Sequence, residues 1–401
     1  MLSFHSASVR IANSERAIDE CFEIAFEGSV PDDLGVVVVN AAIGHKLDKV
    51  AAVVKTHAPG AVVLGTSCGG VVGREGAGEA MTNLAMMAVG GPRQELATAA
   101  VDGLEGGNSY EKGLELARAL HEKLPGASLI YLVCAGLGVA CNRLLEAFDE
   151  VFGGDVPVFG GTSADNYKGI TTFQYLGDSL TEHGAWAIGF ADPTLKAAAT
   201  ATHGFTAYGE PMTVTKVENN QILEFDNLPA WEAYSGRLGL IPEADRENVL
   251  SIIMAGGLAS ELPAELAEAY DSPHILRGAA QGRKKGVMYL SVTVEPGDRF
   301  WLTTRDEDLI FSKQEEALAQ LQKQLDGHTP VAVFQADCLA RGRTLFGKVM
   351  KDEIIGMMQD ALQADGTVPP WLGMYGFGEF CPLSGKNTFH TYTTSLLVLH
   401  R

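Results

Sequence analysis

Short apolar segments alternate with amphipathic segments along the first half of the chain. Uninterrupted apolar runs are typical of strands buried on both faces, and they predict strands at 35–39, 61–65, 129–134 and 156–159. Apolar residues at helical spacing between these runs predict helices at 46–57, 110–123 and 142–152. Strands that alternate with helices favour α/β layers.

The second half of the chain adds antiparallel elements to this pattern. Residues 212–217 and 222–225 flank Asn219 and Asn220, which predicts a hairpin. Further helices are expected at 307–325 and 348–362, and strands at 331–334, 371–377 and 389–399. The sequence therefore predicts a mixed α/β fold with mixed sheets.

One internal repeat supports duplicated strand-helix-strand units. The tripeptides at 65–67 and 161–163 both read Gly-Thr-Ser, and the offset between them also aligns the strand around Val37 with the strand around Val133. A looser third copy spans 331–379. Because equivalent strand ends of duplicated units lie close together, we expect the two Gly-Thr-Ser turns to face a common cleft.

Composition and charge narrow the functional classes. The chain has 401 residues, of which 46% are hydrophobic and 20% charged, so it is globular and long enough for several domains. Its net charge of -20 disfavours nucleic acid and anionic membranes as partners. The first residues do not resemble a signal peptide, and the uncharged stretch 125–142 contains glycines typical of a strand and loop. Six cysteines without a CxxC pair fit reduced thiols, so we expect a cytoplasmic protein.

Small polar residues follow the two predicted strands at 61–65 and 156–159. At strand ends they present hydroxyl and backbone N–H groups where open α/β sheets bind ligands, which makes candidates of Thr66, Ser67, Cys68, Thr162, Ser163 and Asp165. Alternatively, these side chains bond only to their own turns. Cys68 could be a nucleophile, but no sequence signature pairs it with a base, so the favoured interpretation is a small buried thiol.

The C-terminal part contributes a second set of candidates. Arg341 and Arg343 directly follow a strand that ends near Cys338, and a guanidinium there can bind a carboxylate or phosphate bidentately. Glu379 could balance such an arginine or bind a ligand amine. His390 lies in a β-rich run in which alternation would place His390, Tyr392 and Thr394 on one face. The alternatives are surface or interdomain ion pairs for the arginines and a structural histidine.

Several familiar chemistries have no signature in this chain. It contains no phosphate-binding GxxxxGK[ST] loop, no HExxH and no GxSxG. The glycine-rich segment 73–78 departs from GxGxxG and is expected to be a flexible loop. The ten histidines are dispersed, so no metal site is expected. We expect no cofactor, although a haem held by one histidine would leave no local signature.

The sequence resembles FIST proteins, a family of intracellular sensory modules. The similarity includes the apolar strand and turn at 63–73, the segments 158–165 and 185–189, and the junction at 209–216. In the C-terminal part, 338–342 resembles a C-x-G-R-G motif, Tyr375 to Glu379 an aromatic-Gly-Glu motif, and 389–393 an F-H-x-x-T motif. Ala340 stands where the family has glycine, and Phe380 where isoleucine is common.

The resemblance implies two domains, a FIST N-type domain at 1–208 and a FIST C-type domain at 209–401. It further implies a sensor of small molecules such as amino acids, which passes the bound state to a separate signalling protein such as a histidine kinase. One alternative is a NosP-type haem protein that senses nitric oxide and regulates a histidine kinase. Another is an enzyme that acts on a small metabolite through Cys68 or Ser163, although catalysis is not the expected function.

Overall fold

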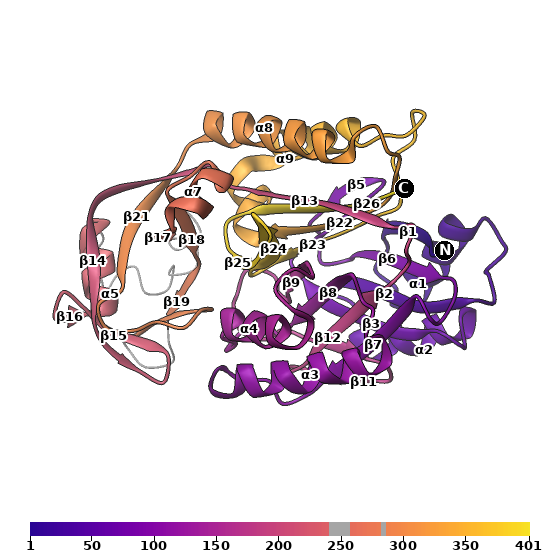
Figure 1. Cartoon of the computed structure of the whole chain (residues 1–401), viewed down its shortest axis with the longest axis horizontal. Helices are drawn as coiled ribbons and strands as arrows, with labels where there is room; N and C mark the ends of the chain where they lie inside the picture. The colour runs from indigo at the N-terminus through magenta and orange to yellow at the C-terminus, as the bar shows by residue number, and fades with distance from the viewer. Residues whose placement is uncertain (240–256, 282–285) are drawn as a thin grey trace.

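The computed structural model describes residues 1–239, 257–281 and 286–401. Its elements form a body of three similar units and an insertion within the third unit (Figure 1). Each unit runs strand, helix, strand, helix, strand, hairpin, strand. Outside the hairpin, the four strands of each unit lie side by side in the order first, last, second, third.

The three units have the following boundaries. The first comprises β1 (Ser3–Arg10), α1 (Ser14–Phe26), β2 (Leu34–Ala42), α2 (Leu47–His57), β3 (Val62–Cys68), β4 (Val71–Gly73), β5 (Gly76–Gly78) and β6 (Asn83–Gly90). The second comprises β7 (Leu96–Val101), η1 (Gly106–Asn108), α3 (Ser109–Lys123), β8 (Leu129–Cys134), α4 (Cys141–Phe152), β9 (Val158–Thr162), β10 (Gln174–Leu176), β11 (Ser179–Thr181) and β12 (Ala185–Phe190). The third comprises β13 (Lys196–Thr202), α8 (Glu307–Leu325), β22 (Pro330–Cys338), η3 (Leu339–Arg341), α9 (Arg343–Ala361), β23 (Trp371–Gly376), β24 (Glu379–Leu383), β25 (Lys386–His390) and β26 (Thr394–His400).

The units exchange their hairpins in a cycle. The hairpin β4–β5 pairs with β23 of the third unit, β10–β11 with β3 of the first, and β24–β25 with β9 of the second. Each of the three sheets therefore has six strands, two of them from another unit. The loop expected at 73–78 is wrong, because Gly73 pairs with Gly76 across a tight turn in which Gly76 has a φ of 102°.

The predicted repeat is visible as three parallel strand pairs joined by helices. These pairs are β2–β3, β8–β9 and β22–β23, so the third copy is present. The offset within the Gly-Thr-Ser repeat does not extend across the sheet. Gly65 pairs with Val39, whereas Gly161 pairs with Val133. Val133 is equivalent to Val37 under this offset, so the strand pairing of the second unit is shifted by two residues relative to the first.

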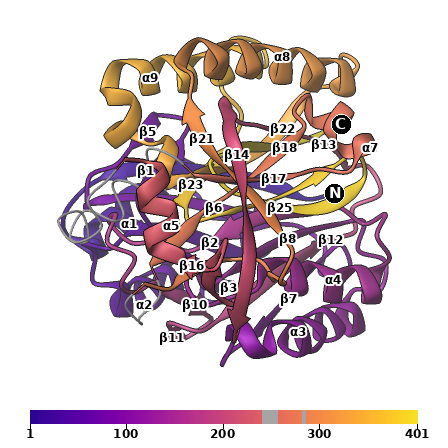
Figure 2. The same ribbon diagram turned by 90° about the vertical axis from the view of Figure 1, so that its left-hand side faces the viewer.

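The inner faces of the three sheets meet in one core. Tyr131 of β8 lies 4.7 Å from Phe334 of β22 and 5.5 Å from Trp186 of β12, measured between ring centroids. A helix pair covers the outer face of each sheet, and Figure 2 shows the three pairs on different sides of the body. The run Val36 to Val39 is apolar throughout because both of its faces are buried.

The insertion lies between β13 and α8 and extends away from the body, on the left of Figure 1. Its described elements are β14 (Phe205–Glu218), β15 (Gln221–Phe225), β16 (Leu228–Pro229), α5 (Ala230–Arg237), β17 (Leu258–Glu261), α7 (Ala264–Tyr270), β18 (His274–Arg277), β19 (Ala279–Gln281), β20 (Met288–Leu290) and β21 (Arg299–Arg305). The predicted hairpin is β14–β15, with Asn219 and Asn220 at φ of 51° and 58° in its turn.

The mixed α/β prediction is confirmed, but one predicted strand is wrong. The segment 389–399 forms two strands, because Tyr392 adopts a φ of 57° between β25 and β26. His390, Tyr392 and Thr394 therefore do not share the face of one strand. The boundary expected at 208/209 falls within β14 and stays a prediction. No helix among the described residues is long and apolar enough to cross a membrane.

Candidate functional site

A pocket of about 100 Å³ lies where strand ends of the body meet the insertion. From the body, the loops after β8 and β9, the turn η3, the loop after β23 and the turn between β25 and β26 line it. From the insertion, β19, β20 and the residues beside them complete the wall. Cys338 is the member of the predicted site set that lines this pocket, and its sequence neighbours Leu339 and Ala340 line it too.

Close backbone contacts fix the shape of the pocket. A Cβ at Gly136 would lie 1.8 Å from the carbonyl oxygen of Ser163, so only glycine lets the loop after β8 pack on the loop after β9. The positive φ of Tyr392 turns the chain from β25 into β26 and leaves this side chain on the pocket wall. The wall is therefore built by backbone geometry as much as by side chains.

The polar groups of the wall are largely engaged with the protein. The Thr391 hydroxyl donates to the Leu276 carbonyl at 2.9 Å and accepts from the Gly278 N–H at 2.7 Å. The Tyr289 hydroxyl donates to the Val139 carbonyl at 2.8 Å. Burial raises the pKa of the Cys338 thiol, so this group is uncharged at neutral pH.

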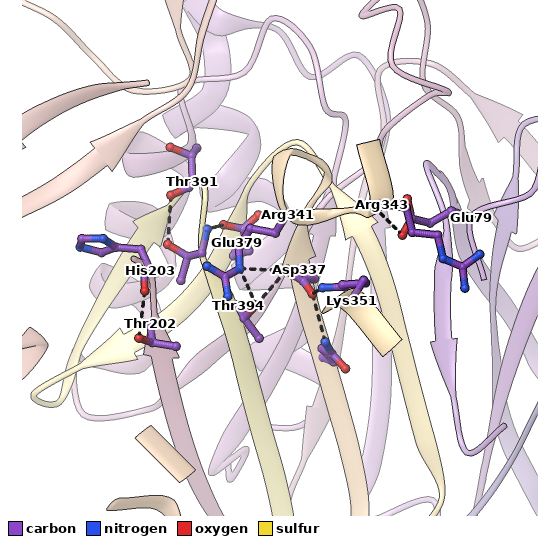
Figure 3. Close-up of polar contacts among 12 residues, drawn as sticks. Glu79, Thr202, His203, Asp337, Arg341, Arg343, Lys351, Glu379, Thr391 and Thr394 are labelled. Carbon is purple, nitrogen blue, oxygen red and sulfur yellow. Dashed lines mark hydrogen bonds and ion pairs between the residues drawn. The ribbon is translucent and has the colours of Figure 1, made fainter. Parts of the chain in front are cut away.

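A buried ion cluster begins at Arg341, the residue after Ala340 (Figure 3). Arg341 is fully buried, and its Nε donates to the Thr394 hydroxyl at 2.8 Å and lies 3.5 Å from Oδ1 of Asp337. The other carboxylate oxygen of Asp337 pairs with the buried Nζ of Lys351 on α9. Nη1 and Nη2 of Arg341 have no hydrogen-bond partner among the described residues. Asp337 thus holds two cations.

Glu379 is the second buried carboxyl in this region. Its Oε2 accepts from the Thr393 N–H at 3.4 Å, and its Oε1 has no partner within the described part of the chain. Burial and the nearby negative charge of Asp337 raise the pKa of Glu379. Asp337 is the carboxylate that pairs with Arg341, whereas Glu379 keeps its proton to a higher pH than an exposed glutamate does.

Arg343 lies in a separate polar group at the start of α9. Its backbone N–H donates to both carboxylate oxygens of Glu79, at 2.9 and 2.8 Å (Figure 3). The Tyr167 hydroxyl donates to the same carboxylate at 2.8 Å. Its guanidinium contacts the Ala77 carbonyl and Asp352, each at 3.1 Å. Arg343 therefore joins the third unit to the β5–β6 turn of the first.

The two Gly-Thr-Ser turns meet, but inside the protein. The hydroxyls of Thr66 and Ser163 lie 2.5 Å apart, and the Ser67 hydroxyl donates to the Ala164 carbonyl at 2.9 Å. Thr66, Ser67, Thr162 and Ser163 are all buried. The turns thus form a buried contact between the first two units instead of lining an open cleft.

The remaining candidates of the first two units have structural contacts. Cys68 is buried, and burial raises the pKa of its thiol to about 12, which keeps the nucleophilic thiolate scarce at neutral pH. The carboxylate of Asp165 accepts from four consecutive backbone N–H groups of its own loop, from Lys168 to Thr171, at 2.7 to 3.4 Å. Asp165 therefore fixes the loop that brings Gly169 to the pocket.

His390 and Tyr375 are both buried away from the pocket wall. Nδ1 of His390 lies 3.2 Å from the Tyr270 hydroxyl, and Nε2 lies 3.1 Å from the Cys381 carbonyl. Burial lowers the pKa of His390 to about 4, so the neutral ring donates through Nε2 and accepts through Nδ1. Because both ring nitrogens are engaged, His390 does not fit an axial haem ligand. No cluster of metal-ligating side chains occurs in the residues that the structure describes.

Two protein-family models match most of the chain. The FIST N domain model matches residues 33–228, and the FIST C domain model matches residues 230–382. The chain belongs to the FIST family. FIST domains are associated with sensing in signal transduction. The boundary between the two matched regions falls at Pro229, the last residue of β16 in the insertion.

Similar proteins do not identify a ligand. Two uncharacterized proteins of Mycobacterium tuberculosis, from strains CDC 1551 / Oshkosh and H37Rv, are each 25% identical over 257 residues, which is 64% of this chain. The chain spans 63% of the length of these relatives. A cyanuric acid hydrolase structure from A. caulinodans covers 100% of this FIST chain and 99% of its own, with 7% identity and a TM-score of 0.37. A second cyanuric acid hydrolase structure gives 9% identity and a TM-score of 0.32, and scores this low support no inference.

Proposed function

We propose that this FIST protein is an intracellular sensor that binds a small molecule in the pocket between the body and the insertion, named the seam pocket below, and passes the bound state to a separate signalling protein. The observation that carries the proposal is the convergence of the second unit, the third unit and the insertion on one pocket. Ligand pockets occur preferentially where separate structural bodies meet. A ligand there contacts both the body and the insertion, so it can favour one arrangement of the two.

The connection from the pocket to the outer surface supports this proposal. Leu339 and Ala340 line the pocket, and the next residue, Arg341, enters the ion cluster with Asp337. The same carboxylate holds Lys351 of α9, a helix on the outside of the body. A shift of η3 on ligand binding should therefore also move α9, because separating these charged groups inside the protein is energetically unfavourable.

The proposal is tested first by ligand extraction and native mass spectrometry on freshly purified protein. A bound small molecule is expected, and refilling the emptied protein should change its X-ray scattering profile or its affinity for a candidate histidine kinase. A ligand can shift the two arrangements only by its difference in affinity for them. Saturation with the extracted ligand and no change in either readout would contradict the sensor function.

Absorption spectroscopy separates this proposal from the haem-based alternative. Protein made with haem available is expected to lack a Soret band at stoichiometric intensity, because the ring nitrogens of His390 are engaged by Tyr270 and Cys381. A stoichiometric Soret band that disappears in a His390→Ala variant would establish the haem-based sensor instead.

A further inference from the structure

We infer that the seam pocket selects an uncharged, mostly apolar molecule of about three to five non-hydrogen atoms. This inference rests on the proposed ligand-binding function of the pocket and specifies the class of ligand. It departs from the amino acids that the family resemblance implies. The observations that carry it are the charge of the wall, the engagement of its hydroxyls and the size of the cavity.

The described residues of the pocket wall offer no charge to a ligand. Among the described residues that line it, none is an aspartate, glutamate, lysine, arginine or histidine. The side chains that face the space are chiefly apolar or aromatic, including Leu137, Leu339, Phe377 and Tyr392. A carboxylate or an ammonium would lose its water here and gain no partner, which is strongly disfavoured.

The ion cluster behind the wall cannot supply that partner. Arg341, Asp337 and Glu379 are each fully buried, and none of them lines the pocket. Arg341 points from η3 into the body, where it contacts Thr394 and Asp337 (Figure 3). A zwitterion in the seam pocket is therefore separated from the charges that would recognise it.

The few polar groups of the wall suit one neutral hydrogen-bonding function at most. The hydroxyls of Thr391 and Tyr289 already donate to backbone carbonyls. The Ser291 hydroxyl and the Cys338 thiol also line the pocket, but Ser291 interacts with the Tyr289 hydroxyl and Cys338 with Glu379, so each adds at most one weak or moderate hydrogen bond. A ligand with a single amide, hydroxyl or carbonyl group fits this wall, whereas a multiply polar ligand leaves groups unsatisfied.

The size of the cavity sets the upper limit of the ligand. An apolar cavity of roughly 150 Å³ in another protein admits benzene. The seam pocket has about 100 Å³, so its ligand is smaller than benzene. Such small ligands bind weakly in absolute terms, because the binding free energy that each non-hydrogen atom can contribute is limited.

Two probes of equal size separate charge from shape. Propionamide and glycine have the same number of non-hydrogen atoms, but propionamide is neutral and glycine is a zwitterion. Saturation-transfer NMR on the full chain is expected to detect binding of propionamide and none of glycine at the same concentration. Isobutyramide and alanine form a second matched pair, one non-hydrogen atom above the size limit.

Gly278→Ala locates the binding in the pocket. A Cβ at Gly278 would lie 3.4 Å from Cγ2 of Thr391, an ordinary contact, so the variant is expected to fold and to reduce the cavity. Propionamide should bind it at least tenfold more weakly, because filling a tight cavity costs about 1.4 kcal/mol or more. Gly60→Ala adds the same group where nothing lies within 4 Å, and it should bind propionamide as the unmodified protein does.

Leu137→Ala changes the pocket in the opposite direction. This half-buried side chain lies on the wall, so its truncation should strengthen binding of isobutyramide relative to propionamide. Binding of glycine that Gly278→Ala abolishes would overturn the neutral ligand class and leave the sensor proposal standing. Binding of neither probe, or propionamide binding that Gly278→Ala leaves unchanged, would overturn the inference. Propionamide binding as expected, without any effect on scattering or kinase affinity, would support the ligand class and contradict the sensor function.

Discussion

Removal of the Asp337 charge should destabilise the protein far more than removal of either cation it holds. Asp337 is fully buried and pairs with Arg341 and Lys351, while Thr394 and Gln335 donate to it at 2.9 and 3.3 Å. Asp337→Asn leaves two buried cations without a carboxylate. Breaking a buried ion pair by removing one partner costs about 3–5 kcal/mol, so we expect the free energy of unfolding to fall by at least about 3 kcal/mol.

Lys351→Met tests the same cluster from the other side. This change removes one of two cations and leaves Asp337 beside Arg341, while the methionine can fill the space next to the Tyr375 ring. Because Asp337 keeps Arg341 as its partner, this change leaves no buried charge unpaired, and the expected loss is below about 1.5 kcal/mol. In the double variant, Lys351→Met should recover about 1 kcal/mol or more of the loss caused by Asp337→Asn.

Urea unfolding followed by tryptophan fluorescence measures these differences. Trp371 is buried on β23, and its Nε1 donates to Gln335 at 3.0 Å, so it reports on the unit that contains the cluster. Asp352→Asn is the matched control, because Asp352 pairs with Arg343 at the surface, where an ion pair contributes about 0–1 kcal/mol. If Asp337→Asn lowers the free energy of unfolding no more than Asp352→Asn does, or if the double variant shows no recovery, Asp337 does not neutralise the two buried cations.

Three further changes test the surrounding geometry. Burial raises the pKa of Glu379, so its stabilising effect is complete below the ordinary glutamate pKa and is lost as pH rises through the folded-state pKa. Glu379→Gln should therefore reduce the decline of the urea midpoint with rising pH. An unchanged slope of midpoint against pH would contradict this prediction. Asp165→Asn weakens the bonds to four backbone N–H groups and should increase amide exchange at 168–171 at least tenfold, whereas unchanged protection would show that the carboxylate does not hold the loop. Gly136→Ala should cost about 3 kcal/mol or more, because its Cβ meets the Ser163 carbonyl, and a wild-type melting temperature would refute that close approach.

The regular elements follow from local pattern, because burial on both faces leaves a clear signal. The helix expected at 307–325 matches α8 residue for residue, and the strand at 129–134 matches β8. The helix α1 was not predicted, and neither was the exchange of hairpins among the units. Which hairpin adds to which sheet is decided by contacts between residues far apart in sequence, such as Gly373 with Val72, and these leave no local pattern.

The candidate site was less predictable than the fold. The sequence indicated Cys338, and it placed the two Gly-Thr-Ser turns close to each other, but it did not indicate Gly136, Tyr289 or Lys351. The role of Gly136 depends on a backbone atom 27 positions away in the chain. Tyr289 belongs to a part of the insertion where no strand was predicted. Glycines and tyrosines are common enough that only the fold distinguishes those of the pocket wall.

Arg341 shows why a charged residue after a strand is ambiguous in sequence. A guanidinium at that position can bind a ligand or neutralise a carboxylate of its own strand end, and both roles need the same spacing. Asp337 lies four residues earlier, at the end of β22, and the turn η3 brings Arg341 back over it. Burial of the strand end decides between the two roles, because a fully buried carboxylate must be neutralised by a nearby cation. The turn supplies Arg341 as that cation, so its charge is already paired in the absence of a ligand.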